Sequence, residues 1–242
     1  MTYMAKPQKA AVEISNISKA YGSTKAAKNI SLSIPQGSLY ALIGPNGAGK
    51  STMMKMIVGL LRQDKGTIHI FNEDTIKNSV QAKTLLSYIS DDPTPYDYLS
   101  GLEFIELTAR LRGLIMTDAL ATSKKLTKQF GLEKIIRQPV SQYSRGSRQK
   151  VAFIAAMISN PRLLVIDEPI VGLDPGSIDV FGNELLEYVK KGGTVLLATH
   201  ILPFAAKYAD RVAVMYNGQI VIERPITENT NLERIYELAM ES

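Results

Sequence analysis

The chain has 242 residues, of which 45% are hydrophobic and 21% charged, so it is long enough to bury a substantial core and too apolar for a disordered protein. It contains no cysteine, which excludes a disulfide framework and a thiolate metal site and favours a reducing compartment. The net charge of +5 suits an anionic ligand or an anionic membrane surface, but the basic residues form no long run.

Neither a signal peptide nor a membrane-spanning helix is expected. The segment Met1 to Lys9 is polar and lacks an apolar core. A spanning helix needs about 20 apolar residues, whereas the best candidate, Val195 to Ala206, is shorter and is interrupted by His200 and Pro203. We therefore expect a soluble chain, so that any work at a membrane requires another chain to supply the membrane part.

The first predicted elements are β-strands. Ala11 to Ile17 and Ile30 to Ile34 have the apolar pattern of strands, and a polar loop carrying Tyr21 and Gly22 separates them. After a turn, Leu39 to Ile43 is predicted to form a short, fully apolar strand.

A glycine-rich stretch follows this apolar strand. It matches the phosphate-binding pattern G-x-x-x-x-G-K-[ST] at every fixed position with the residues Gly44, Pro45, Asn46, Gly47, Ala48, Gly49, Lys50, Ser51 and Thr52. Glycines let backbone N–H groups turn around a phosphate, and the helix expected after Gly49 points its positive end at the same anion. Lys50 is expected to reach the β- and γ-phosphates, and the Ser51 hydroxyl to ligate Mg²⁺. The pattern predicts a nucleoside triphosphate site, the alternative being a glycine turn that binds nothing.

Two further strands are predicted, Thr67 to Phe71 and Leu85 to Ser90, and after them the residue pattern changes from strand-like to helical. The run from Asp91 to Pro95 breaks any regular element, and from Ser100 to Ile136 the pattern is helical. Ser100 and Glu103 form a predicted capping box at the start of the first helix. We interpret residues 93–141 as a helical sub-domain inserted into the core.

The remainder alternates strands and helices. A helix is expected from Ser147 to Ser159 and a terminal helix from Leu232 to Met240, and three strands are predicted at Leu163–Ile166, Thr194–Ala198 and Val212–Met215. Such alternation predicts an α/β fold with a parallel, phosphate-loop (RecA-like) sheet core, an N-terminal antiparallel β part and the inserted α-helical sub-domain. We expect one domain over residues 1–242, with the core in 1–92 and 142–230 and a tail helix in 231–242.

Two adjacent carboxylates end the strand that begins at Leu163. Asp167 is expected at the carboxyl edge of the sheet near the phosphate loop, where it can hold Mg²⁺ directly or through water. Glu168 would then orient and deprotonate a water for attack on the γ-phosphorus, a contribution of typically ~10²–10⁴-fold. The alternative is that both acids only solvate the end of a strand.

The order of these motifs resembles the ATP-binding-cassette (ABC) ATPases over Val12 to Val221. The stretch from Tyr143 to Gln149 precedes the carboxylates, the stretch from Gly172 to Pro175 follows them, and Thr199-His200 ends the next strand. In that family the first of these, usually Leu-Ser-Gly-Gly-Gln, meets the γ-phosphate held by a second subunit.

The resemblance implies roles for residues in these motifs. Ser144 and Gly146 match the signature, whereas Tyr143, Arg145 and Ser147 depart from it in a way more typical of exporter cassettes. A helix-capping serine without ligand is the alternative for Ser144.

Four further positions are assigned by the same resemblance. His200 matches the switch histidine that contacts the γ-phosphate, and Asp174 matches the aspartate at the dimer interface. Tyr21 matches the aromatic residue that stacks on adenine, the alternative being a tyrosine packed in its loop. Asp91 stands where the family usually has glutamine, and its oxygens could still approach Mg²⁺ or its water.

These assignments predict a subunit that uses ATP and Mg²⁺. Two copies, identical or paralogous, would close head to tail on ATP and drive a separate transmembrane permease subunit, for export, from the cytoplasmic face of the membrane. The loop from Pro93 to Leu99 is where the family docks that permease, and Tyr96 and Tyr98 would suit the interface or pack under the sub-domain.

Two other classes of function are alternatives to this prediction. A soluble cassette ATPase acting on nucleic acid or ribosomes usually has two cassettes or a long coiled coil, and neither is present, so no nucleic-acid partner is expected. A phosphate-loop kinase or GTPase would leave the signature and His200 unexplained, and the guanine-specifying Asn-Lys-x-Asp is absent.

Overall fold

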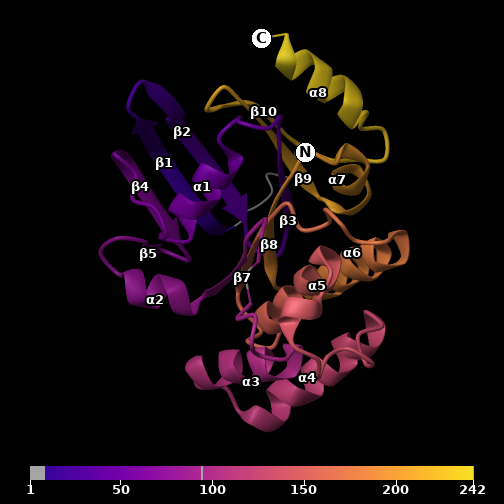
Figure 1. Cartoon of the computed structure of the whole chain (residues 1–242). Helices are drawn as coiled ribbons and strands as arrows, with labels where there is room; N and C mark the ends of the chain where they lie inside the picture. The colour runs from indigo at the N-terminus through magenta and orange to yellow at the C-terminus, as the bar shows by residue number, and fades with distance from the viewer. Residues whose placement is uncertain (1–8, 94, 242) are drawn as a thin grey trace, which may run out of the picture.

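The computed structural model describes residues 9–93 and 95–241. Three parts of the sequence predictions lie outside these residues: the polar segment before Lys9, Thr94 in the predicted break, and Ser242 at the end of the predicted tail helix. Within the described residues the chain forms two sheets and a set of helices, as expected for an α/β fold (Figure 1).

The first sheet is antiparallel and four-stranded, in the order β2-β1-β4-β5. Its strands are β1 (Ala10–Tyr21), β2 (Thr24–Pro35), β4 (Lys65–Ile70) and β5 (Glu73–Asp74). Strands β1 and β2 are longer than expected, and the prediction that Tyr21 lies in a loop is wrong, because Tyr21 ends β1 and pairs with Thr24. The outer ends of this hairpin are polar and exposed, so they lack the alternation from which strands are predicted.

The second sheet has six strands in the order β10-β9-β3-β8-β7-β6. They are β3 (Leu39–Ile43), β6 (Leu86–Ile89), β7 (Leu163–Asp167), β8 (Thr194–Thr199), β9 (Arg211–Tyr216) and β10 (Gln219–Pro225). Neighbours from β9 to β6 run parallel, and β10 pairs antiparallel with β9. Strand β10 was not predicted, because no residue of this edge strand is fully buried.

The described helices follow the expected alternation. They are α1 (Lys50–Ile57), α2 (Ser79–Thr84), α3 (Gly101–Leu111), α4 (Met116–Gln129), the 3₁₀ turn η1 (Val140–Gln142), α5 (Arg145–Met157), α6 (Pro175–Lys190), α7 (Leu202–Tyr208) and α8 (Leu232–Met240). The capping box of α3 is confirmed: Glu103 N donates to Ser100 Oγ at 3.2 Å, and Ser100 N donates to Glu103 Oε2 at 2.8 Å. Helix α2 was not predicted.

Alternate residues of the central strands enter two separate cores. In β3, Leu39, Ala41 and Ile43 belong to one core, which the helices α3 to α8 cover. Tyr40 and Leu42 face the other core, where the methionines of α1 pack between the parallel and the antiparallel sheets. The helix that follows the phosphate loop is therefore held from both sides.

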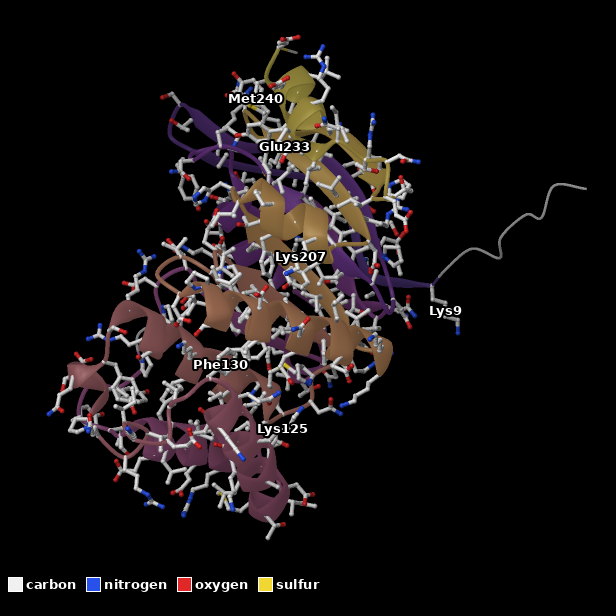
Figure 2. All side chains as sticks on the ribbon, turned by 90° about the vertical axis from the view of Figure 1, so that its right-hand side faces the viewer. Lys9, Lys125, Phe130, Lys207, Glu233 and Met240 are labelled. Carbon is white, nitrogen blue, oxygen red and sulfur yellow. The ribbon has the colours of Figure 1, made fainter. Side chains whose placement is uncertain are left out.

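Helices α3 and α4 lie at one end of the molecule and α8 at the other (Figure 1). Figure 2 shows the same separation, with Lys125 of α4 and the adjacent Phe130 in the lower part of the view and Glu233 and Met240 of α8 near the top. Lys125 and Gln129 of α4 both donate to Glu184 of α6, at 3.2 and 2.6 Å, which ties the helical part to the core. The boundaries of this sub-domain at residues 93 and 141 stay a prediction. Among the described residues, no helix has the length and apolar character needed to cross a membrane.

Candidate functional site

The carboxyl ends of three neighbouring parallel strands meet at one edge of the second sheet. Strand β3 leads to Gly44, β7 to Glu168 and β8 to His200. Loops beyond such strand ends are the usual ligand site of an open α/β sheet. A cleft of 610 Å³ opens here, and the predicted residues that line it are Tyr21, Asn46, Gly47, Gly49, Lys50, Ser51, Thr52, Asp91 and Glu168.

Two glycines of the phosphate loop are required by close backbone approach. A Cβ on Gly44 would collide with the carbonyl oxygen of Met215, and a Cβ on Gly49 with that of Ala26. Gly49 also has φ 108°, a conformation that favours glycine. The loop is therefore clamped between the start of β2 and the end of β9. Pro45 and Ala48 close its turn, since Ala48 N donates to Pro45 O at 3.2 Å.

The Lys50 ammonium group is buried and points back into the phosphate loop. It donates to the carbonyl oxygens of Gly44 at 2.8 Å and Pro45 at 3.2 Å, and it lies 3.5 Å from Glu168 Oε1. A buried ammonium needs such partners because desolvation without them is costly. A phosphate group bound in the loop could replace these contacts with charge-assisted ones.

Asp167 is 1% exposed at the end of β7. Burial raises the pKa of its carboxyl group, while a hydrogen bond from the Ser51 hydroxyl opposes that rise. Its Oδ1 atom is buried and has no hydrogen-bond partner among the described residues. A buried, unpartnered carboxylate oxygen beside a hydroxyl fits a hard cation such as Mg²⁺.

Glu168 has φ 48°, in the left-handed region that residues with a Cβ rarely adopt. Such strain is of order ~1–3 kcal/mol and persists where the surroundings fix it. Here Glu168 N donates to Ala198 O at 2.9 Å, and the side chain lies between Lys50 and His200. The backbone and both neighbours thus hold the carboxylate at the cleft.

His200 contacts the second oxygen of this carboxylate. Its Nδ1 lies 3.0 Å from Glu168 Oε2, and its backbone N donates to the same oxygen at 3.3 Å. Because an ionised carboxylate only accepts hydrogen bonds, Nδ1 carries the hydrogen, which leaves Nε2 for another partner. The side chain is 46% exposed, so it remains accessible.

The predicted signature residues lie away from the cleft of their own chain. Ser144 caps α5, accepting a hydrogen bond from Ser147 N at 3.2 Å. Gly146 packs so closely on the Gly172 carbonyl oxygen that a Cβ would collide with it. Asp174 caps α6 by accepting from Ser177 N at 2.9 Å. None of the three predicted residues, Ser144, Gly146 and Asp174, lines the cleft described above.

Tyr21 and Asp91 both line the cleft, with different surroundings. Tyr21 is 52% exposed and so lies at the surface of the cleft, and its stacking on adenine stays a prediction. Asp91, expected near Mg²⁺, accepts a hydrogen bond at 2.9 Å from Arg145 at the start of α5.

Residues 27–171 match the ABC transporter family. The chain belongs to this family. The lantibiotic transport ATP-binding protein SrtF of Streptococcus pyogenes is 32% identical over 225 residues, which span 93% of this chain and 95% of the relative. The bacitracin transport ATP-binding protein BcrA of Enterococcus faecalis is 34% identical and covers 93% of this chain and 72% of its own length. DrrA of Streptomyces peucetius, a daunorubicin/doxorubicin resistance ATP-binding protein, is 34% identical, with coverages of 88% and 64%.

Solved structures agree with this membership. A solved structure of the ATP-binding subunit of an ABC transporter superposes with a TM-score of 0.89 at 29% identity. The match covers 95% of this chain and 99% of the chain in that structure. The cassette MJ0796, in a dimeric post-hydrolysis state bound to ADP and Pi, has a TM-score of 0.78 at 25% identity and covers 89% and 99%. The chain is an ATP-hydrolysing cassette subunit of an ABC transporter, and such a subunit works with a transmembrane partner.

The cassette also brings residues to the cleft that the sequence analysis missed. Lys25 and Lys28 of β2, together with Asn217 and Gly218 of the β9–β10 turn, line it. The two lysines place positive charge where a polyphosphate would bind. Isolated lysines in a polar hairpin give no motif, so only the folded hairpin reveals them.

Proposed function

We propose that this cassette hydrolyses Mg²⁺-ATP with Glu168 as general base, and that two copies close head to tail on the nucleotide to drive export. The observation that supports it best is the Glu168 carboxylate, which lines the cleft and is held 3.5 Å from Lys50 and 3.0 Å from His200. A general base must first lie in the right position, and only then does its pKa matter. The contacts with Lys50 and His200 hold Glu168 in position. The left-handed backbone at Glu168 adds to that restraint.

Within one copy, the phosphate loop from Gly44 to Thr52 would hold the polyphosphate and Lys50 would neutralise it. Ser51 and Asp167 would hold Mg²⁺, which supplies neutralisation of the charge that develops on the phosphates. No group of three or more His, Cys, Asp or Glu side chains forms a metal site within the described residues. That is consistent with Mg²⁺, which is commonly held by one or two protein groups plus phosphate oxygens. The adenine would stack on Tyr21, and His200 in its imidazolium form, with a hydrogen on each ring nitrogen, would donate from Nε2 to the γ-phosphate.

The second copy would complete the site. Ser144 and Gly146 lie at the start of α5, where the Ser144 hydroxyl and backbone N–H groups can face an anion. Because they lie outside their own cleft, the nucleotide of an opposing copy is the anion they suit. Asp174, the residue that caps α6, would lie at the same interface.

The permease would dock beside the loop that follows β6. Tyr96 and Tyr98 are 52% and 78% exposed and their rings lie 5.8 Å apart, which leaves an aromatic surface without cover in this chain. The neighbouring cavity of 220 Å³ is lined by Tyr88, Phe104 and other residues of β6, α3 and α5. Export follows from the relatives, two named for transport of lantibiotic or bacitracin and one for drug resistance. The docked cassette would lie on the cytoplasmic face. The alternative of an ATPase acting on nucleic acid or ribosomes has no support from these relatives.

The test is Glu168→Gln, which keeps the size of the side chain and removes its basicity. We expect steady-state ATP hydrolysis to fall by about 10²–10⁴-fold, while binding of a fluorescent ATP analogue persists. Release of phosphate measures the first and fluorescence titration the second.

The matched control is Glu187→Gln, an exposed position on α6 far from the cleft. It should hydrolyse ATP at the parent rate. Unchanged turnover in Glu168→Gln would show that another group is the base.

A further inference from the structure

Two residues at which this chain departs from the usual pattern of the family contact each other. Arg145 NH2 donates to Asp91 Oδ1 at 2.9 Å and to the Asp91 carbonyl oxygen at 3.4 Å, although 54 residues separate them. Asp91 lines the nucleotide cleft, and Arg145 is the first residue of α5. This ion pair therefore joins the edge of one site to the helix start that we assign to the other.

The start of α5 is unusually rich in positive charge. Its first turn contains Arg145 and Arg148 and no acidic residue, and cations are unfavourable at the positive end of a helix dipole. The Nε atom of Arg148 is buried and has no hydrogen-bond partner among the described residues. The Asp91 carboxylate pairs with Arg145 at 2.9 Å and offsets part of this charge. Local rules are broken in this way mostly at functional sites.

The ion pair is also easy to exchange. The side chains of Arg145 and Asp91 are 49% and 53% exposed, and an ion pair so open to solvent contributes little to stability. A phosphate group carries more charge and binds a guanidinium in a bidentate manner. The aliphatic part of Arg145 lies over Gly172, so the guanidinium can change partner while the stem stays packed.

We infer that Arg145 binds the phosphates of the nucleotide held by the opposing copy, and that Asp91 restrains it in the nucleotide-free chain. The inference rests on the head-to-tail arrangement proposed above. Arg145 stands between Ser144 and Gly146, the residues that face that nucleotide in the arrangement. The exchange adds a full positive charge at a position where the usual signature has a glycine.

The experiment uses the full chain carrying Glu168→Gln, with saturating Mg²⁺ and ATP, and measures the dimer dissociation constant by sedimentation velocity. Arg145→Gln should raise this constant roughly tenfold or more, because each dimer loses two charge-assisted contacts to phosphate. Asp91→Asn should leave the dissociation constant equal or lower it, because the charge that restrains Arg145 is gone while an oxygen that can approach Mg²⁺ remains. A purely structural tie makes the opposite prediction for Asp91→Asn, which would then weaken the dimer as Arg145→Gln does.

Arg110→Gln is the matched control, since it removes the same charge from an exposed position on α3. It should leave the dissociation constant unchanged. If Glu168→Gln alone forms no dimer with ATP, the head-to-tail proposal fails and the inference falls with it. If it dimerises and Arg145→Gln dimerises equally well, or Asp91→Asn weakens the dimer, the inference alone is overturned.

Discussion

Burial of Asp167 should make the nucleotide-free protein less stable as the pH rises. Its pKa is raised above the unfolded value of 3.8, so between the two pKa values the folded chain binds more protons than the unfolded chain, and stability falls with increasing pH. The contribution of the protonated Asp167 to the free energy of unfolding is fully present below pH 3.8, and it is lost as the pH rises above the pKa of the folded state. We expect Asp167→Asn to raise the melting temperature at pH 7 and to flatten its dependence on pH above 3.8. Calorimetry without nucleotide and Mg²⁺ across a pH series measures both, and a lower melting temperature at pH 7 would contradict the argument.

The contact between Gly146 and Gly172 gives a second prediction for a single residue. A Cβ at position 146 would collide with the Gly172 carbonyl oxygen, which is backbone and cannot turn away cheaply. Gly146→Ala should therefore destabilise the chain by about 1–3 kcal/mol, measured by denaturant unfolding.

Gly176→Ala is its matched control, because it occupies the same position in α6 that Gly146 has in α5. An added Cβ there meets only Asp174 Oδ1, at 3.5 Å. Equal losses in the two variants would mean that the close approach is not the cause.

At this scale the sequence predicts residues whose partners are near in the chain. The glycines of the phosphate loop, Lys50 and the two carboxylates could be assigned because strand, turn and helix follow one another within a few residues. The pairing of Asp91 with Arg145 could not, because it depends on where β6 ends and α5 begins in space. Nor could the left-handed backbone of Glu168, since no local residue pattern demands it.

Among the elements, the contact between α4 and α6 is the clearest to test. Glu184 is 8% exposed and accepts hydrogen bonds from both Lys125 and Gln129. Glu184→Ala should lower the free energy of unfolding by about 1–3 kcal/mol, because it removes the hydrogen bonds that its charged carboxylate accepts from α4. Denaturant titration followed by circular dichroism measures the loss.

Glu187→Ala serves as the comparison, because its ion pair with Lys190 is exposed and should change stability by no more than about 0.5 kcal/mol. If both alanine variants lost the same stability, the tie between α4 and α6 would carry no special weight.

Element boundaries were predicted best where caps and apolar periodicity coincide. Helix α8 spans Leu232 to Met240 as expected, and its cap is a side chain, Asn231, that accepts from Arg234 N at 2.8 Å. Helix α5 begins at Arg145, two residues before the predicted start, because Ser144 is its cap. Strand β10 and helix α2 escaped prediction because neither presents a continuous buried stripe.

For the whole molecule, a site shared between two copies predicts a rate that depends on assembly. In dilute solution the hydrolysis rate should rise more than linearly with protein concentration and approach second order, because Ser144 must come from another molecule. Phosphate release measured over a dilution series gives the order. A strictly proportional rate would show that one chain hydrolyses ATP by itself.

The layered α/β architecture could be predicted from alternating strands and helices, but the order of the strands could not. Strand β3 lies between β8 and β9, which follow it by about 150 residues or more in the chain. Only long-range packing decides that order, and it is this order that brings Gly44, Glu168 and His200 together.

The division of the interior into two cores has a mechanical consequence. Each central strand sends its odd-numbered and its even-numbered side chains into different hydrophobic cores. The two cores are therefore separated by the sheet and have no buried side chain in common. The buried side chains of α3 and α4 pack in one core and the methionines behind the phosphate loop in the other, so repacking of these helices does not act directly on the methionines. An ATPase with two such cores can repack its helical sub-domain while its phosphate loop keeps the position that binds the nucleotide.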